Sequence, residues 1–345
     1  MKISPFALKK LRDGFYVVLL SVFLGGLFAC IMSTAITGRF RPHDDFRYIL
    51  LGSLTGFGVS AGILLLKEMF LKMKTQPLWF SLLVAPFLQT ALIALVYASV
   101  FISLLGYDSF RKDSYLFQTV VFSLLITVLT SLYADIERLL GRHVLKGLLF
   151  GTYRRAKKEN RFVMFLDLAG STAAAERLGA LKFHAFLNDF FCDIARPITN
   201  HKGEIYKYVG DEVIITWPEK AADLVHNPLT VFFTIDETIK KRQNYYTSRY
   251  GLVPQFRAGL HYGSIVAGEM GLTRQEIAFS GDVMNTAARI QSECRLRNEV
   301  FLVSDDALKC LRGNADLPVS LNIISHGTVS LRGKSSEIAI SAVRL

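Results

Sequence analysis

Arg161-Phe-Val-Met-Phe-Leu-Asp167-Leu-Ala-Gly-Ser-Thr172 is the segment whose pattern says most about how this chain folds. Its apolar run, which ends at Asp167, is too hydrophobic for a strand with one face in water, so it predicts a buried strand. Gly170-Ser-Thr172 then opens a predicted helix. Free N–H groups at such a helix start are well suited to hold phosphate groups. The segment therefore predicts a strand, a carboxylate and a phosphate-binding turn in succession.

A second carboxylate, Asp211, stands in a Gly-Asp turn further along the chain. The turn separates Glu204-Ile-Tyr-Lys-Tyr-Val209 from Val213-Ile-Ile-Thr-Trp217, which is the pattern of a β-hairpin. Mg²⁺ typically takes one or two protein carboxylates together with phosphate oxygens. Asp167 and Asp211 are therefore predicted to bind a metal ion beside a nucleoside triphosphate. The alternative for both aspartates is an ordinary role as helix cap and turn residue.

The composition bounds the class of protein. The chain has 345 residues, is 51% hydrophobic and has a mean hydropathy of +0.33, which predicts more than one domain and membrane segments in part of it. The four cysteines are scattered without a CxxC pair, so neither a disulfide framework nor a zinc site is predicted. We attribute the net charge of +11 to positively charged segments that set the orientation in the membrane and contact anionic lipid. No nucleic-acid partner is predicted, because no such binding signature is present.

Four apolar stretches in the first half are long enough to cross a bilayer, which takes ~20 residues per helix. They are 15–37, 48–66, 78–105 and 115–134. The first has no small-residue cleavage site, which favours an uncleaved helix over a signal peptide. No stretch contains a charge, so an anchor or sensor is predicted rather than an ion pathway. Pro86 and Gln89 lie in the third stretch, where the proline predicts a kink.

Lysine and arginine predict the orientation of this four-helix transmembrane region. They are concentrated in the tail 1–14, in the loop 67–74 and after the fourth span, whereas the two opposite loops are mixed in sign. Since cytoplasmic segments carry the excess of positive charge, both termini are predicted to lie in the cytosol. The sequence thus predicts a multi-pass protein of the inner (cytoplasmic) membrane. Its predicted parts are the tail 1–14, the membrane region 15–134, a juxtamembrane helix and linker 135–159, and a catalytic domain 160–345.

The predicted juxtamembrane helix has one apolar stripe, formed by Ile136, Leu140, Val144 and Leu148. The stripe predicts pairing with a second copy of the chain or contact with the bilayer surface. Basic residues 153–158 then predict a short exposed linker.

Strand and helix patterns alternate from Arg161 onward. Helices are predicted over 172–179, 181–198, 228–244 and 283–297. A strand pair is predicted over 256–262 and 264–268 with its turn at Gly263, followed by strands 300–303, 328–331 and 337–343. These elements predict an α+β sheet with helices on one face.

Four separated motifs resemble the catalytic domain of the class III nucleotidyl cyclases, which are the adenylyl and guanylyl cyclases. The motifs are Phe165-Leu-Asp-Leu-Ala-Gly-Ser-Thr172, Lys207-Tyr-Val-Gly-Asp211, Arg257-Ala-Gly-Leu-His-Tyr-Gly263 and Gly281-Asp-Val-Met-Asn-Thr-Ala-Ala-Arg289. They stand in the family's order and cover about 160–345. The resemblance implies a ferredoxin-like α+β domain that converts ATP to 3′,5′-cyclic AMP and pyrophosphate.

The resemblance also implies a role for each site residue. Asp167, the adjoining Leu168 and Asp211 would bind two Mg²⁺ or Mn²⁺ ions, of which one activates the ribose 3′-hydroxyl and both stabilise charge at the α-phosphate. Asn285 would orient the ribose, and Arg289, on the same helix face, would stabilise the pentavalent phosphate. The triphosphate would contact Gly170, Ser171, Thr172 and Lys334. The working unit would be a homodimer, with the metal aspartates from one chain and Lys207, Asn285 and Arg289 from the other.

Base choice depends on two positions. Lys207 matches the lysine that reads adenine N1 in adenylyl cyclases, whereas guanylyl cyclases usually have glutamate there. The second base-reading position falls at Ala278, whose side chain accepts no hydrogen bond from the adenine amino group. We therefore expect ATP to be preferred over GTP, with weaker discrimination than in relatives that keep a polar residue there.

Three alternatives follow from the same residues. One is a guanylate or relaxed-specificity cyclase. Another is a membrane receptor with a catalytically silent cyclase domain, although Asp167, Asp211, Asn285 and Arg289 are all present. A diguanylate cyclase is disfavoured, because the turn at Tyr208-Val-Gly-Asp-Glu212 lacks that family's first glycine and its phenylalanine.

Overall fold

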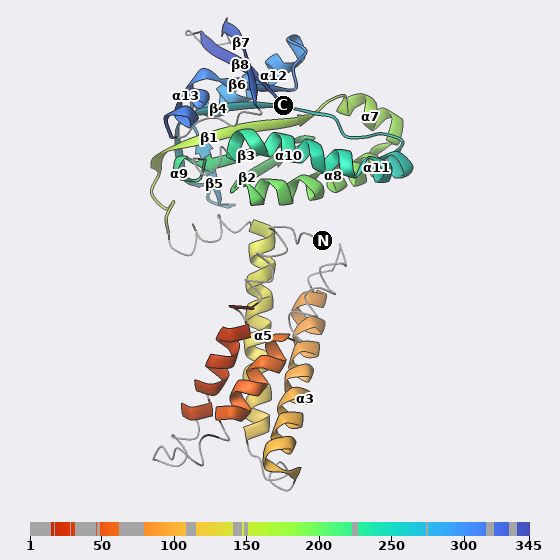
Figure 1. Ribbon diagram of the computed structural model, residues 1–345, viewed down its shortest axis with the longest axis vertical. Coiled ribbons are helices and arrows are strands. Elements are labelled where there is room, and N and C mark those ends of the chain that lie inside the picture. The colour runs from red at the N-terminus through yellow and green to blue at the C-terminus, as the bar shows by residue number, and fades with distance from the viewer. Residues whose placement is uncertain are drawn as a thin grey trace. The chain divides into compact units, whose positions relative to one another are not determined.

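The chain divides into two compact units, Met1–Leu140 and Gly141–Leu345, in the computed structural model (Figure 1). The structure describes residues 15–16, 18–27, 29–31, 46, 49–61, 79–107, 115–140, 147, 151–222, 227–273, 275–314, 321–330 and 337–345.

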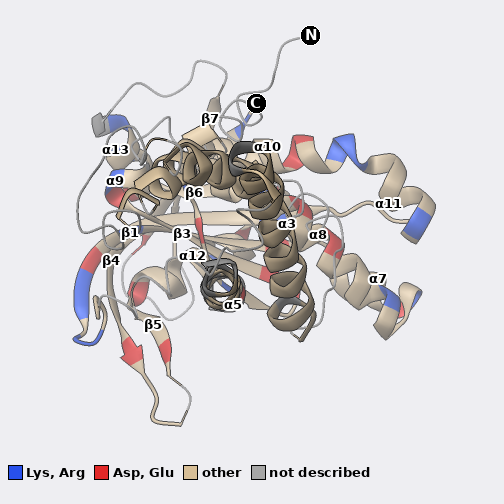
Figure 2. Ribbon diagram, turned by 90° about the horizontal axis from the view of Figure 1, so that it is seen from below, with Lys and Arg blue, Asp and Glu red and all other residues tan. Residues whose placement is uncertain are grey.

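The longer described stretches of the first unit are helices. They include the π-helical turn η1 (Phe80–Val84), α3 (Ala85–Leu105) and α5 (Tyr115–Leu140). Within the described residues one helix, Leu82–Ser103, is long and apolar enough to cross a membrane, and Figure 2 shows α3 without a charged residue. Val18–Ile31 and Ile49–Ala61 are shorter apolar helices, and Ser123–Tyr133 is a shorter apolar stretch within α5. The sequence prediction of four spans is thus supported for one of them by length and composition.

The disturbance predicted at Pro86 takes the form of a π-turn. Pro86 lies in the first turn of α3, and the preceding turn widens so that Ala85 N–H donates to the carbonyl oxygen of Phe80. Proline has no N–H to give to the helix, and irregular turns of this kind are a common way to accommodate it.

Small and polar residues make some of the contacts between helices of the first unit. The hydroxyls of Thr90 and Thr127 lie 3.2 Å apart, both buried, and join α3 to α5. A Cβ on Gly52 would collide with the carbonyl oxygen of Gly25, and one on Gly56 with that of Ser21. The helices Val18–Ile31 and Ile49–Ala61 therefore approach each other backbone to backbone, which is typical of helix packing in membranes.

The second unit is built on an eight-stranded sheet in the residues described. The strand order is β2-β3-β1-β4-β6-β8-β7, with β5 paired to β4, and only β4 and β6 run parallel. The strands are β1 (Lys157–Leu168), β2 (Glu204–Val209), β3 (Glu212–Pro218), β4 (Phe256–Met270), β5 (Glu276–Ser280), β6 (Phe301–Ser304), β7 (Asn322–Val329) and β8 (Ile338–Arg344). The predicted buried strand and the predicted hairpin at Gly210–Asp211 are both confirmed.

Helices cover both faces of this sheet, so the prediction of helices on one face only is wrong. The helices are α7 (Ser171–Leu178), α8 (Ala180–Asn200), α9 (Glu219–Ala222), α10 (Asn227–Lys241), α11 (Gln243–Tyr250), α12 (Asp282–Leu296) and α13 (Asp305–Asn314). Phe162, Met164 and Leu166 pack with α8 and α10, which lie side by side (Figure 1), whereas Val163 and Phe165 pack with α12. The physical reason is the unbroken apolar run of β1, which needs cover on both sides.

Gly263 is not a turn residue, and the predicted pair of strands around it is one continuous strand, β4. β4 pairs with all twelve residues of β1, from Lys157↔Ala267 to Leu168↔Phe256. A Cβ on Gly263 would lie 2.6 Å from a methyl carbon of Val283, so this glycine gives α12 room to approach. The true hairpin turn follows Met270 and leads into β5, which the sequence analysis did not predict.

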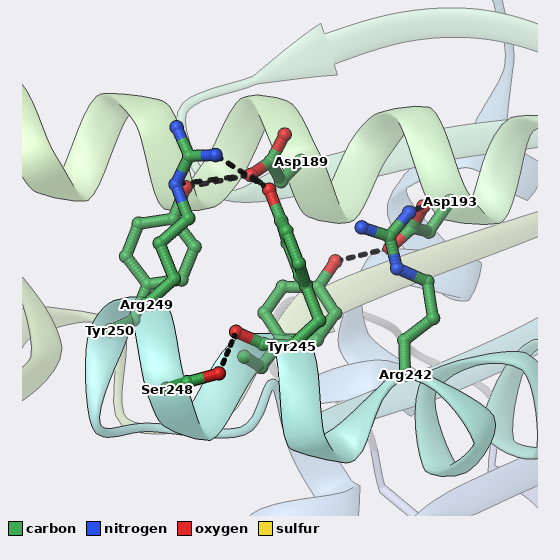
Figure 3. Close-up of polar contacts among 8 residues, drawn as sticks. Asp189, Asp193, Arg242, Tyr245, Ser248, Arg249 and Tyr250 are labelled. Carbon is green, nitrogen blue, oxygen red and sulfur yellow. Dashed lines mark hydrogen bonds and ion pairs between the residues drawn. The ribbon is translucent and has the colours of Figure 1, made fainter.

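The predicted helix 228–244 is divided in two at Arg242, where α10 ends and α11 begins. α11 is held against α8 by a polar cluster (Figure 3), defined here as the α8–α11 cluster. In it, Asp189 Oδ2 accepts hydrogen bonds from the hydroxyls of Tyr245 at 2.6 Å and Tyr250 at 2.7 Å. Asp193 accepts one from Tyr246 and pairs with Arg242, each at 2.6 Å.

The predicted exposed linker 153–158 is exposed from 154 to 158, but it differs from the prediction at its two ends. Tyr153 is buried, with its hydroxyl near the buried Arg161, and Lys157 already begins β1. α5 continues past the predicted end of the fourth span to Leu140. Val144 and Leu148 of the predicted apolar stripe lie outside the described residues, so its pairing partner stays a prediction.

Candidate active site

Asp167 and Asp211 are brought together at one edge of the sheet. Asp167 is the last residue but one of β1 and lies opposite Glu212 in β3. Asp211 follows Gly210 in the two-residue β2–β3 turn, where the φ of 64° at Gly210 favours glycine. The two aspartate side chains are close enough to interact electrostatically. The sheet pairing therefore confirms that these carboxylates converge.

The surroundings of this pair disfavour its negative charge. Burial, followed by the charge of Asp211, raises the pKa of Asp167 to about 6. Burial, with the charges of Asp167 and Asp211, raises the pKa of Glu212 to about 7. Among the residues the structure describes, no lysine or arginine forms an ion pair with any of these three. Carboxylates gathered without a compensating cation fit a site for a positively charged ligand.

The donor set fits a divalent cation that takes further ligands from a substrate. Carboxylate oxygens are what Mg²⁺ and Mn²⁺ prefer, and Mg²⁺ needs only one or two of them from the protein. In the described part of the chain no group of three or more His, Cys, Asp or Glu forms a metal cage. Leu168 has its side chain in the core, so only its backbone carbonyl oxygen is left for a metal.

Two contacts of this site were not predicted. Gln291 Nε2 on α12 lies 3.3 Å from Asp167 Oδ2, and Glu212 was passed over although it directly follows Asp211. The adjacency of Glu212 to Asp211, in a hairpin whose turn was predicted, is a signal that would have found it. The contact of Gln291 with Asp167 depends on the close packing of α12 against β4. At this point a Cβ on Gly259 would collide with the helix backbone at Ala287 and Gln291. That approach has no local sequence signal.

The predicted phosphate-binding turn lies next to Asp167. Gly170 has a φ of 72° and precedes α7, so the N–H groups of Ser171 and Thr172 belong to the first turn of that helix. Ser171 is half-buried, and Gly170 and Thr172 are exposed. Such N–H groups have no partner within the helix and are available to an anion. Lys334 lies outside the described residues and stays a prediction.

Asn285 and Arg289 lie on α12, one turn apart, and neither makes a polar contact to Asp167 or Asp211 among the residues described. Asn285 is exposed and Arg289 half-buried. Arg289 and Gln291 are two positions apart, so they project from nearly opposite sides of the helix, at ~100° per residue. Because Gln291 reaches Asp167, Arg289 is directed away from the aspartate pair of its own chain.

Lys207 and Ala278 lie on β2 and β5, close to each other in space. Lys207 Nζ is 3.5 Å from Glu276 Oε1, two residues before Ala278 on β5. Tyr206 stacks on Phe279 with ring centroids 4.4 Å apart, and its hydroxyl accepts a hydrogen bond from Phe279 N–H. These contacts hold β2 beside β5, so the two sequence-predicted base-reading positions are brought together.

Comparisons with known proteins match the second unit. A model of the adenylate and guanylate cyclase catalytic domain matches residues 154–341. The chain is 38% identical over 205 residues to adenylate cyclase 2 of Rhizobium meliloti (strain 1021), covering 59% of this chain and 55% of that one. It is 24% identical over 186 residues to an adenylate cyclase of Anabaena cylindrica, covering 53% of this chain and 36% of that one. This chain thus spans about half or less of these two relatives.

A solved structure of a bacterial light-regulated adenylyl cyclase has the same fold. It superimposes with a TM-score of 0.54 at 19% sequence identity, covering 65% of this chain and 64% of that one. The resemblance that the four motifs predicted is confirmed.

Proposed function

We propose that this chain, which belongs to the family of adenylate and guanylate cyclase catalytic domains, is a membrane-bound adenylate cyclase that makes 3′,5′-cyclic AMP and pyrophosphate from ATP. The observation that carries the proposal is the pair Asp167 and Asp211, whose clustered negative charge forms no ion pair with a described lysine or arginine, next to the N-terminus of α7. A nucleoside triphosphate with a divalent metal ion supplies both the missing positive charge and the phosphate that such a helix start binds.

The reaction joins the ribose 3′-oxygen to the α-phosphorus and breaks the bond from that phosphorus to the oxygen of the leaving pyrophosphate. The 3′-hydroxyl proton is released to water, and the pyrophosphate leaves with the electron pair of the broken bond. Two divalent metal ions held by Asp167 and Asp211 would supply Lewis-acid stabilisation of the charge on the reacting oxygens. The N–H groups of Ser171 and Thr172 bind the triphosphate.

The remaining roles belong to α12 and β2. Arg289 donates hydrogen bonds from its guanidinium to the α-phosphate oxygens, whose charge grows as the reaction proceeds. Asn285, four residues earlier on the same face, holds the ribose so that its 3′-oxygen faces the phosphorus. Lys207 donates to adenine N1. Asp167 and Asp211 thus bind the metal, and the other three residues orient the substrate.

We infer that the working unit is a homodimer whose sites are shared between chains. The direction of Arg289, nearly opposite to Gln291 and away from the aspartate pair of the same chain, supports this arrangement. Two chains related by a two-fold axis would bring the aspartates of one to Asn285, Arg289 and Lys207 of the other, and would form two equivalent sites.

We infer that the first unit is a multi-pass membrane region with the cyclase in the cytosol. Three observations support it: large apolar side chains such as Phe87 and Leu95 are exposed, buried Thr90 and Thr127 hydrogen-bond between helices, and glycines make the closest helix contact. An apolar exterior around a polar contact is the pattern expected in lipid. Membrane lipid is then a partner of this unit.

A turnover assay tests the function. Purified full-length protein in detergent or vesicles is given ATP or GTP with Mg²⁺ or Mn²⁺, and the products are identified by mass. We expect cyclic AMP and pyrophosphate in equal amounts from ATP, with less product from GTP and none without a divalent metal. The absence of turnover with either nucleotide and either metal would contradict the proposal and favour a catalytically silent domain.

A further inference from the structure

A cavity of about 440 Å³ lies beside the β4–β5 hairpin. The described residues that line it are Lys207, Met270, Gly271 and Glu276. Lys207 and Glu276 face each other with Nζ 3.5 Å from Oε1, and both side chains are about half exposed, at 49% and 48%. An ion pair this exposed contributes at most about 1 kcal/mol to stability. The pair therefore adds little to the fold and leaves a donor and an acceptor side by side in a cavity.

The strand pairing places Glu276 on the same face as Ala278. The two residues are two apart on β5, and Ile277 between them is buried against the α12 face of the sheet. Side chains two apart on a strand share one face. Glu276 lies opposite Met270, and Ala278 lies opposite Gly268. The carboxylate that Ala278 lacks is thus present one step along the same face, and it already reaches Lys207.

We propose that Glu276 is the second base-reading residue of this site and reads the adenine amino group in place of Ala278. The proposal rests on the proposed cyclase function. The adenine edge offers an acceptor at N1 next to a donor at the N6 amino group, whereas Lys is a donor only and ionised Glu an acceptor only. Lys207 donates to N1 while Glu276 accepts from N6. Two protein atoms 3.5 Å apart suit two neighbouring positions on one edge of a base, so the pair binds adenine without separating.

The same pair disfavours guanine. At these two positions guanine presents an acceptor at O6 and a donor at N1, which is the reverse of adenine. Glu276 would then face a carbonyl oxygen and Lys207 an N–H group. Met270, which is 57% exposed beside Glu276, provides an adaptable apolar wall for the face of the base. Glu276 is therefore assigned as a residue that determines specificity for ATP.

The test compares Glu276→Ala and Glu276→Gln with the unaltered full-length protein. The control is Glu269→Gln, which removes a carboxylate from the same hairpin; Glu269 lies opposite buried Ile277, on the other face from Glu276. Two measurements are made for each protein: kcat/KM with ATP and with GTP, and equilibrium binding of non-cyclisable α,β-methylene analogues of both nucleotides.

We expect Glu276→Ala to lower the ATP-to-GTP ratio of kcat/KM by about tenfold or more, as for loss of a hydrogen bond to a charged group. Glu276→Gln should lower it too, because its amide can turn an NH₂ group toward guanine O6. The analogue binding ratio should fall in parallel, and Glu269→Gln should retain the original ratio.

Three outcomes separate this proposal from the proposed function. An unchanged ratio in both Glu276 variants of an active enzyme would leave the function standing and overturn the assignment, with the pair then a surface ion pair only. A preference of the unaltered protein for GTP would also overturn it. If the unaltered protein turns over neither nucleotide, the proposed function fails, but the binding of the two analogues still tests the role of Glu276. Loss of the preference for the ATP analogue in Glu276→Ala would support base reading by Glu276, and an unchanged preference would refute it.

Discussion

Asp189 and Asp193 on α8 are surrounded by donors, whereas Asp167 and Asp211 lie beside a third carboxylate, Glu212, with the Gln291 amide as their one described side-chain donor. In the α8–α11 cluster three tyrosine hydroxyls and Arg242 contact the two carboxylates at 2.6–2.7 Å (Figure 3). Burial and the bond to Asp193 raise the pKa of Tyr246, which therefore stays protonated as a donor. At the sheet edge it is instead an aspartate, Asp167, whose pKa is raised.

The difference separates carboxylates that stabilise the fold from carboxylates that we propose to bind a ligand. A carboxylate satisfied by the protein adds to stability, while two that repel each other cost stability and are retained where function needs them. Four experiments, three with single variants and one with a mixture of two variants, test this contrast.

The largest expected effect is on turnover in Asp211→Asn. Removing one carboxylate charge from the metal-binding pair should lower cyclic AMP production roughly a hundredfold or more, since metal stabilisation of the reacting oxygens is worth several kcal/mol. The thermal unfolding temperature should stay the same or rise, because the repulsion with Asp167 is relieved. Near-normal turnover in a folded Asp211→Asn protein would contradict the metal assignment.

The next effect is rescue of activity by mixing. Asp211→Asn and Arg289→Ala should each be inactive alone, but a co-expressed pair forms mixed dimers with one intact site. With random pairing, about a quarter of normal activity should return, since half of the dimers are mixed and each has one of two sites. Activity is measured on the co-expressed mixture and on mixed dimers isolated through two different affinity tags, for which about half of normal activity is expected because one of their two sites is intact. If isolated mixed dimers remain inactive, each chain builds its own site.

A smaller effect, on stability, is expected for Asp189→Asn. The amide oxygen is a weaker acceptor for the hydroxyls of Tyr245 and Tyr250, so the free energy of unfolding should fall by about 1–2 kcal/mol. Turnover per folded molecule should change less than about twofold, as the cluster lies apart from the proposed metal ligands. Chemical denaturation of the purified chain, with cyclic AMP assays below the transition, measures both. A loss of turnover without a loss of stability would reverse the comparison.

The smallest effect is expected for Lys240→Ala on α10. Lys240 pairs with Asp236 at 2.6 Å, but its side chain is 72% exposed. An exposed i,i+4 pair contributes only about 0.3–0.5 kcal/mol, so the unfolding free energy should change by no more than that. Turnover should stay the same. A shift as large as that of Asp189→Asn would show that proximity of charges, rather than burial with hydrogen bonds, explains the α8–α11 cluster.

The sequence predicted those parts of the catalytic unit whose signals are local. The apolar run of β1 and the Gly-Asp turn predicted the convergence of Asp167 and Asp211, and the helix 283–297 was predicted within a residue of α12. The parts that were wrong depend on distant partners. Gly263 resembles a turn residue in sequence, but a glycine is needed there because Val283 packs against it. The strand β4 continues through Gly263 because it pairs with β1 along the whole length of β1.

The break between α10 and α11 has the same origin. No glycine or proline marks position 242, and the helical pattern runs on through it. The chain turns there because Arg242 pairs with Asp193 and the tyrosines of α11 reach back to α8. Glu276 was passed over because only the pairing of β5 with β4, itself not predicted, brings it to Lys207.

Gly259 sets how closely α12 approaches β4 because it has no side chain. At this point α12 rests on β4 with nothing between the two backbones, so the thickness of the chain itself sets their separation. One added methyl group would have to lift the helix, and with it Gln291 from Asp167 at one side and Arg289 from its position at the other. The distance between α12 and β4 at the proposed active site is thus set by Gly259, a residue with no proposed role in the chemistry.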